Sequence, residues 1–245
     1  MTGSLVLGAL LILCGPVIGM LMTTLAKRLC SGRIDSSVWF RSALRKVTGR
    51  PGNPAPPVSP QPVPKGRDGC ETGLARTRWP GALAGLGGAV LAVLAGGAAS
   101  ETLLAAAFLW LLIGLFETDR LCQRLPDVLT APLLGVGIAL GIQHASLFYV
   151  ALSAAVGAGA LWMLAVLYRR HSGRDGLGFG DVKLMAGISA AVGATAIPWV
   201  TLVASGLALA TSLWRQRRYD PQAAVPFGCY LAIAAALVWT STATV

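Results

Sequence analysis

The sequence is poor in charged residues. Asp, Glu, Lys and Arg make up 12% of its 245 residues, about half the share in a typical soluble domain, and the mean hydropathy is +0.67. The apolar residues form blocks close to the roughly 20 residues that cross a bilayer, rather than the alternating or narrow helical stripes of a soluble core. These features exclude an ordinary soluble domain. They predict an all-α protein, a polytopic bundle of membrane helices surrounded by lipid.

Metal ligands and paired cysteines are also scarce. The two histidines, His144 and His171, lie in separate loops without a neighbouring carboxylate, so we expect both at the surface rather than on a metal. The five cysteines contain no CxxC pair, and an odd number leaves at least one unpaired. We therefore predict no metal site, no structural zinc module and no disulfide scaffold. The cysteines are Cys14, Cys30, Cys70, Cys122 and Cys229.

The apolar runs give eight candidate membrane spans. Thr102–Phe116 and Val128–Ile142 are short for a full crossing, so we expect six to eight spans. The first is not expected to be a cleavable signal peptide, because no basic residue precedes it and no small-residue cleavage site follows it. The candidates are Leu5–Leu25, Gly81–Ala99, Thr102–Phe116, Val128–Ile142, Leu147–Tyr168, Val182–Ala196, Ile197–Trp214 and Pro226–Thr240.

The formal net charge of +10 would suggest nucleic-acid binding in a soluble protein, but the positions of the basic residues indicate another role. With eight spans, every Lys and Arg falls in or beside the first, third, fifth or seventh connection, and the other connections contain none. The positive-inside rule places such connections in the cytoplasm. We therefore expect both termini outside the cytoplasm, contact of the basic loops with anionic lipid headgroups, and no nucleic-acid partner.

The chain divides into three expected parts. Residues 1–25 form a first transmembrane helix, residues 26–79 a basic, proline-rich cytoplasmic loop, and residues 80–245 a transmembrane core. Within the loop, seven prolines between Pro51 and Pro64 cannot join a helix and predict an extended or disordered linker. Ser36–Lys46 fits either a basic amphipathic helix on the membrane surface or an ordinary basic loop, and both alternatives stay open.

With only ten acidic residues in the chain, carboxylates beside apolar spans stand out, because ionisable groups are costly there and usually functional, and two such sites matter. Asp119 lies between the third and fourth spans and Asp181 enters the sixth, so both meet the cytoplasmic face. Two like charges in a low-dielectric site cannot both ionise easily, so the carboxylates would share one proton. The ionised member would activate water, and the protonated member would protonate a leaving amine. The pattern predicts an aspartic-type endopeptidase that works without a metal.

Neighbouring residues are candidates for supporting roles. Gly178 and Gly180, just before the second aspartate, would let a neighbouring helix or an extended peptide approach closely. Asp127 follows a proline, which favours an N-cap role for the fourth span, and Asp181 could equally cap its own helix. Lys183 would either help to hold a carboxylate ionised or extend to the membrane interface as an ordinary lysine, and the second role is favoured.

Three segments together resemble the bacterial type IV prepilin peptidases, a family of GxGD aspartyl proteases. Their order, spacing and membrane context agree with that family from about Pro80 onward, whereas the stretch from Gly15 to Leu29 matches it only faintly. The segments are Asp119 with Leu125-Pro126-Asp127-Val128-Leu129-Thr130, then Gly178-Phe179-Gly180-Asp181-Val182-Lys183-Leu184, then Pro226-Phe227-Gly228-Cys229-Tyr230-Leu231-Ala232.

The resemblance implies that Asp119 and Asp181 are the catalytic pair and that Asp127 is structural or supporting. It implies a multi-pass protein of the bacterial inner membrane whose active site, near the cytoplasmic face, removes a basic leader from a prepilin or pseudopilin. The implied cut follows a glycine and precedes an apolar helix, and no cofactor is implied for it. Many members also carry a CxxC zinc module and methylate the new N-terminus with S-adenosylmethionine. Because the corresponding first loop of this chain has a proline-rich stretch with Cys70 alone in place of that module, methyl transfer stays an open alternative.

Two other classes of function also stay open. A proton-coupled transporter would use the same carboxylates along a continuous polar path, but the spans contain almost no other charged groups and show no sign of inverted repeats. A non-catalytic scaffold of a pilus or secretion assembly would be favoured if the two aspartates stood too far apart to share a proton.

Overall fold

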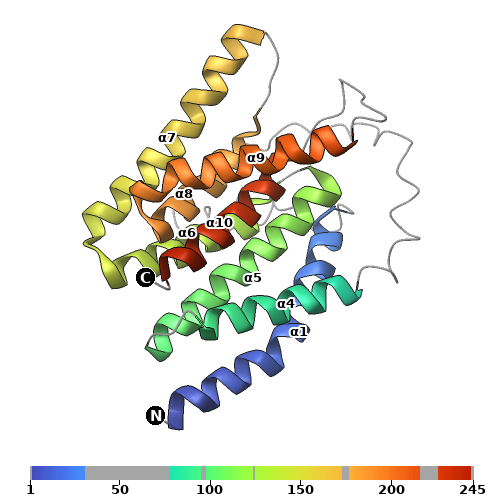
Figure 1. Ribbon diagram of the computed structural model, residues 1–245, viewed down its shortest axis with the longest axis vertical. Coiled ribbons are helices and arrows are strands. Elements are labelled where there is room, and N and C mark those ends of the chain that lie inside the picture. The colour runs from blue at the N-terminus through green and yellow to red at the C-terminus, as the bar shows by residue number, and fades with distance from the viewer. Residues whose placement is uncertain are drawn as a thin grey trace, which may run out of the picture.

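The computed structural model describes residues 2–30, 78–94, 98–123, 125–172, 177–215 and 226–243. The proline-rich linker and the candidate amphipathic helix Ser36–Lys46 lie outside these residues. The described part contains eight α-helices and one short 3-10 turn, and each predicted span corresponds to one α-helix (Figure 1). The elements are α1 (Thr2–Cys30), α4 (Arg78–Leu94), α5 (Ala99–Cys122), α6 (Asp127–His144), α7 (Leu147–Ser172), α8 (Phe179–Val192), η1 (Ala194–Ala196), α9 (Ile197–Arg215) and α10 (Phe227–Ala243).

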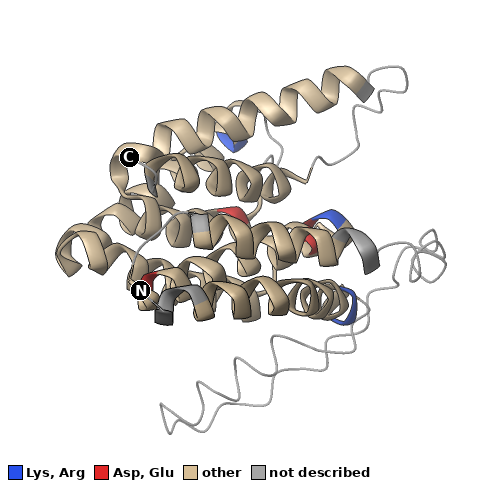
Figure 2. Ribbon diagram, turned by 60° about the horizontal axis from the view of Figure 1, so that its bottom comes forward, with Lys and Arg blue, Asp and Glu red and all other residues tan. Residues whose placement is uncertain are grey.

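The lengths and composition of the helices are those of a multi-pass membrane protein. The helices α1, α5, α6 and α7, together with η1 and α9, provide five stretches long and apolar enough to cross a membrane, while α4 and α10 are shorter apolar helices. Charged residues are few along the described ribbon (Figure 2). The predicted all-α polytopic bundle is therefore confirmed.

The helix α5 is the centre of the bundle. It contacts α1 and α4 on one side and α6 and α10 on the other (Figure 1). Its side chains Phe108 and Leu115 are fully buried, and Phe108 lies against the ring of Trp239 from α10. A polar residue on this helix is consequently placed among four other helices rather than against lipid.

Small residues bring several helix pairs into close contact. Gly15 and Gly19 of α1 face Gly85 and Gly81 of α4 so closely that a Cβ on Gly15 would stand 2.7 Å from the carbonyl oxygen of Gly85. Such contacts are typical of membrane helices, whose association depends on close van der Waals packing. The stretch that matched the family only faintly therefore has a packing role.

The helix α8 is held in the same way between α6 and α7. A Cβ on Gly137 of α6 would collide with the carbonyl oxygen of Gly187, and a Cβ on Gly157 of α7 would collide with the hydroxyl of Ser189. With 14 residues, α8 is shorter than a full bilayer crossing. Its glycine-lined contacts fix where its first turn lies.

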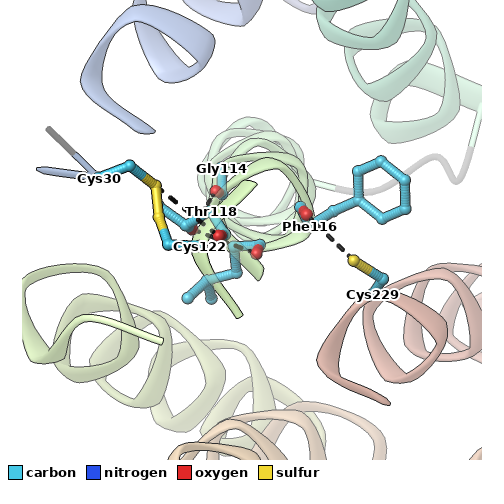
Figure 3. Close-up of a disulfide and its surroundings, with 7 residues drawn as sticks. Cys30, Gly114, Phe116, Thr118, Cys122 and Cys229 are labelled. Carbon is cyan, nitrogen blue, oxygen red and sulfur yellow. Dashed lines mark hydrogen bonds between the residues drawn. A yellow bond between two sulfur atoms is a disulfide. The ribbon is translucent and has the colours of Figure 1, made fainter. Parts of the chain in front are cut away.

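No disulfide scaffold was expected, and the described residues contain one disulfide. Cys30, the last residue of α1, and Cys122, the last residue of α5, form a disulfide with a Cα–Cα distance of 5.7 Å (Figure 3). Counting cysteines could not reveal this pair, because the residues are 92 positions apart in the sequence and meet only once both helices have packed. Cys14 and Cys229 are free, and Cys70 lies outside the described residues.

Replacing Cys122 with serine is expected to lower the melting temperature of the purified protein by several degrees. A chain-entropy model gives up to about 4–5 kcal/mol for closing so long a loop, and the effect here should be smaller because unfolded membrane helices keep part of their order. Differential scanning fluorimetry of C122S against C14S, which removes an exposed free thiol, measures the difference. Equal melting temperatures, or free thiols at both positions in non-reducing peptide mapping, would contradict the pairing.

Candidate active site

The first carboxylate of the site lies inside a helix. The predicted third span ended at Phe116, but α5 continues for more than another turn to Cys122, so Asp119 is part of the helix rather than of a loop. Its side chain is only 5% exposed. A buried carboxylate is costly unless it is hydrogen-bonded or has a role that requires it.

The helix α10 supplies the hydrogen bond to this carboxylate. The backbone N–H of Cys229 donates to Asp119 Oδ2 at 2.8 Å. Cys229 is the third residue of α10, where backbone N–H groups have no partner within the helix and the helix dipole favours a negative charge. The Cys229 thiol also lies 3.3 Å from the Phe116 carbonyl oxygen, on the side of α5 opposite the disulfide (Figure 3).

The second carboxylate begins α8. Asp181 is the third residue of this helix and 7% exposed. Its Oδ2 accepts a hydrogen bond from the backbone N–H of Gly178 at 3.3 Å, and its own N–H donates to the Gly178 carbonyl oxygen at 3.1 Å. Asp181 therefore does cap its helix. This leaves Oδ1 for another interaction.

The two carboxylates meet at Gly228. If residue 228 had a Cβ, that atom would stand 3.0 Å from Asp119 Oδ2 and 3.0 Å from Asp181 Oδ1, so these oxygens are separated by no more than twice that distance. The two groups also act on each other electrostatically. Carboxylates this close in a low-dielectric site cannot both ionise easily. Residues from three helices thus bring two carboxyl groups to one point.

The glycines before Asp181 differ in what surrounds them. A Cβ on Gly180 would stand 2.8 Å from the Cβ of Leu125, so the absence of a side chain lets the start of α8 lie against the connection between α5 and α6. Gly178 is exposed, and a Cβ there would stand 3.5 Å from Asp181 Oδ2 and 3.9 Å from the backbone nitrogen of Gly180. Gly180 therefore positions the second carboxylate, and Gly178 leaves one side of it uncovered.

The predicted N-cap role of Asp127 is wrong. Asp127 is the first residue of α6, the N-cap is Pro126, and no side chain caps the helix. The carboxylate instead pairs with Lys183, whose Nζ lies 2.6 Å from Asp127 Oδ1 and 5.3 Å from the centre of the Phe179 ring. Lys183 thus ties the first turn of α6 to the first turn of α8, beside the site.

Replacing Lys183 with methionine is expected to lower the rate of the expected peptidase reaction by no more than about tenfold. The free energy of unfolding should fall by less than about 1 kcal/mol, because Lys183 and Asp127 are both half-exposed. The same loss is expected for D127N, and the double variant should be no worse than either single variant. K183R should recover most of the activity. Rates measured on all four variants test this, and complete inactivity of K183M in folded protein would instead place Lys183 on the substrate.

Three features of the site region were not predicted from the sequence. Gly228 and Cys229 belong to a segment that was named only because it resembles the prepilin peptidases. The one signal in the sequence that could have indicated their role was a glycine near the start of the last apolar span. Glu117 is 8% exposed, one turn before the end of α5. His144 is exposed as expected, but it does have a carboxylate partner, since its Nε2 lies 3.0 Å from Glu101 Oε1.

Fold and site together define a class: an all-α membrane protein in which two buried aspartates, from different helices, face each other beside a glycine. Residues 106–213, which include both aspartates, match the model of the type IV leader peptidase family. The resemblance to bacterial prepilin peptidases predicted from the sequence is confirmed.

Curated relatives agree with this match. The chain is 36% identical over 149 residues to a prepilin leader peptidase/N-methyltransferase of Aeromonas hydrophila, covering 58% of this chain and 51% of the relative. Proteins of the same name from Stutzerimonas stutzeri and Dickeya chrysanthemi are 37% identical over 136 residues and 39% identical over 131 residues, covering 53% and 51% of this chain and 47% and 46% of the relatives. The chain thus spans about half the length of the curated relatives it matches. No solved structure matches the chain significantly.

Proposed function

We propose that this protein is a membrane aspartyl endopeptidase that removes the basic leader from prepilins or pseudopilins, with Asp119 and Asp181 as the catalytic pair. The supporting observation is the meeting of the two carboxylates at Gly228. The protein would act in the bacterial inner membrane, on the cytoplasmic side, where the positive-inside distribution puts both aspartates.

The hydrogen bonds suggest which carboxylate plays which part. The short bond from the Cys229 N–H to Asp119 at 2.8 Å supports the ionised form of that group, so Asp119 is assigned as the base. It takes a proton from a water molecule whose oxygen attacks the scissile carbonyl carbon. Asp181 holds the other proton and gives it to the amine nitrogen as the carbon–nitrogen bond breaks. The two groups then exchange roles for the next cycle.

The same geometry disfavours the two other classes of function. A transporter needs a polar path through the bundle, but the buried residues of α5 that precede Glu117 are all apolar. A scaffold has no need for two carboxylates close enough to share a proton. Keeping such a pair buried is costly unless it performs chemistry.

Cleavage of a defined substrate tests the proposal. Protein in lipid nanodiscs is incubated with a prepilin that has a basic leader, and mass spectrometry locates the cut. We expect a single cut after the leader glycine and before the apolar helix. Folded protein that leaves several prepilins and pseudopilins intact would overturn the proposal.

Methyl transfer is a separate question raised by the names of the relatives. S-adenosylmethionine would be the methyl donor, but neither of two hollows near the site has a lining that suits a nucleoside with a charged amino acid. One is apolar except for Glu117 and Arg120 at one end, and the other has Arg169 as its charged residue. We therefore derive no step through this donor. Adding it to the cleavage reaction and looking for a product one methyl group heavier tests the activity directly.

A further inference from the structure

An apolar groove runs along α5 to the neighbourhood of the catalytic pair. Figure 1 shows α4 and α10 on either side of α5, and the groove lies between them with a volume of about 400 Å³. The groove is lined from α4 by Ala84, Gly87, Gly88 and Leu91, from α5 by Leu109, Leu112, Ile113, Phe116, Glu117 and Arg120, and from α10 by Ala232, Ile233 and Ala236.

Small residues keep this groove open. A Cβ on Gly87 would meet no other atom within 4 Å, so nothing in the bundle fills the space beside it. Leu91 on one wall and Ile233 on the other are exposed. The groove is therefore open toward the lipid and lined by apolar side chains, so a helix could enter it from the membrane.

One buried carboxylate stands at the end of this trough. Glu117 lines the groove and is 8% exposed. Among the described residues, however, its carboxylate has no hydrogen-bond partner and no ion-pair partner. Arg120 and Lys27 act on it electrostatically from farther away. A carboxylate buried beside an apolar surface needs a cationic partner, and a ligand that brings a positive charge would provide one.

The acidic end of the groove adjoins the active site. Glu117 precedes Asp119 by two residues, and the Phe116 carbonyl oxygen lies 3.3 Å from the Cys229 thiol, next to the N–H that holds Asp119. Along the axis of α5, Leu109 and Glu117 are about 12 Å apart, or two helical turns. The groove can therefore seat about two turns of a second helix whose beginning lies at the catalytic pair.

We propose that the groove between α4 and α10 binds the apolar helix of the substrate and that Glu117 receives the positive charge just before it. This inference rests on the proposed function, because it takes a chain with a basic leader followed by an apolar helix as the substrate. Such a helix runs antiparallel to α5 and has its N-terminus at Glu117. Its dipole and the adjoining leader both bring positive charge to that end, and its apolar side chains cover the trough.

The other hollow beside the site fits this substrate less well. It lies between α7 and the start of α8, with a volume of about 180 Å³, and it includes Arg169 but no carboxylate. A basic leader would meet an uncompensated like charge there, whereas in the groove along α5 the carboxylate of Glu117 accompanies Arg120. Size and the presence of a carboxylate both favour the groove along α5.

Photo-crosslinking tests the docking without requiring catalysis. A photoactivatable residue is placed at position 87 in the inactive D181N background and, as a matched control, at Gly159 of α7, which also has no atom within 4 Å of a built Cβ. We expect a crosslink from position 87 to the apolar helix of an added prepilin and none from position 159. Crosslinks at 87, together with no prepilin cleavage by the protein that keeps Asp181, would refute the peptidase and keep the docking site. Efficient cleavage by the protein that keeps Asp181, with no crosslink from position 87 in D181N, would do the opposite.

Filling the groove gives the matching kinetic test. G87L is expected to raise KM for a full-length prepilin by at least tenfold with little change in kcat, whereas G159L should behave like the unmodified protein. G87L and G159L should cleave equally well a short peptide that contains the leader and the cut site but lacks the rest of the apolar helix. Unchanged KM in G87L would overturn the proposal.

The charge at the end of the groove is tested by a double-mutant cycle. E117Q should raise KM for a prepilin with a basic leader, and the effect should disappear when the leader residue nearest the cut is changed from Lys or Arg to Gln. Independent, additive effects of the two changes would show that Glu117 does not receive the leader.

Discussion

Asparagine in place of Asp119 or Asp181 is expected to lower the rate of prepilin cleavage by at least about 10³-fold, since each change removes either the base or the acid of the reaction. Because the two carboxylates work as a unit, the double variant should be no less active than either single one. The melting temperature of each single variant should stay the same or rise, because asparagine removes the unfavourable electrostatic interaction between the buried carboxyl groups of Asp119 and Asp181 beside Gly228. Single-turnover cleavage in nanodiscs, followed by mass spectrometry, measures the rates.

The matched control for this prediction is D127N. It makes the same chemical change on a half-exposed aspartate that pairs with Lys183 rather than with the catalytic groups. We expect it to keep at least about a tenth of the activity. If D127N were as inactive as D119N while D181N cleaved normally, the catalytic pair would have to be reassigned.

The eight helices could be predicted from the sequence because lipid imposes a simple requirement. Each backbone polar group in the bilayer must be satisfied within its own segment, so a long apolar run can only be a helix. The same reasoning failed at the end of α5. The charged stretch after Phe116 was assigned to a loop, but Asp119 is covered by α10 and Glu117 faces a groove. Both can remain helical and buried.

Contacts between segments far apart in the chain could not be predicted from the sequence. The disulfide joins two helix ends 92 residues apart, and Lys183 meets Asp127 across two helices. Neither pair has a local spacing that could show it. Asp119 and Asp181 could be singled out because a carboxylate beside an apolar span is rare in itself, whereas a glycine is common and Gly228 gave no such signal.

Gly228 is the position where the smallest change should have a large effect. Alanine there would put its Cβ 3.0 Å from Asp119 Oδ2, 3.0 Å from Asp181 Oδ1 and 3.1 Å from Asp119 Cγ. These contacts are tighter than carbon and oxygen ordinarily allow, so the carboxylates must move apart. A displacement of a reacting group by up to about 1 Å can cost on the order of 10² in rate. We therefore expect G228A to lower kcat about 100-fold and to leave KM nearly unchanged.

We expect G228A to fold, because alanine favours a helix more than glycine does and Gly228 lies in the first turn of α10. The control is G206A in α9, where a Cβ would meet no atom within 4 Å; it should keep full activity and at least the same melting temperature. Equal activity of G228A and G206A would mean that the two carboxylates do not meet at residue 228 in the working enzyme. Conversely, a fall in kcat confined to G228A would locate the reaction at the point where α5, α8 and α10 converge, since the three atoms nearest to that Cβ all belong to Asp119 and Asp181.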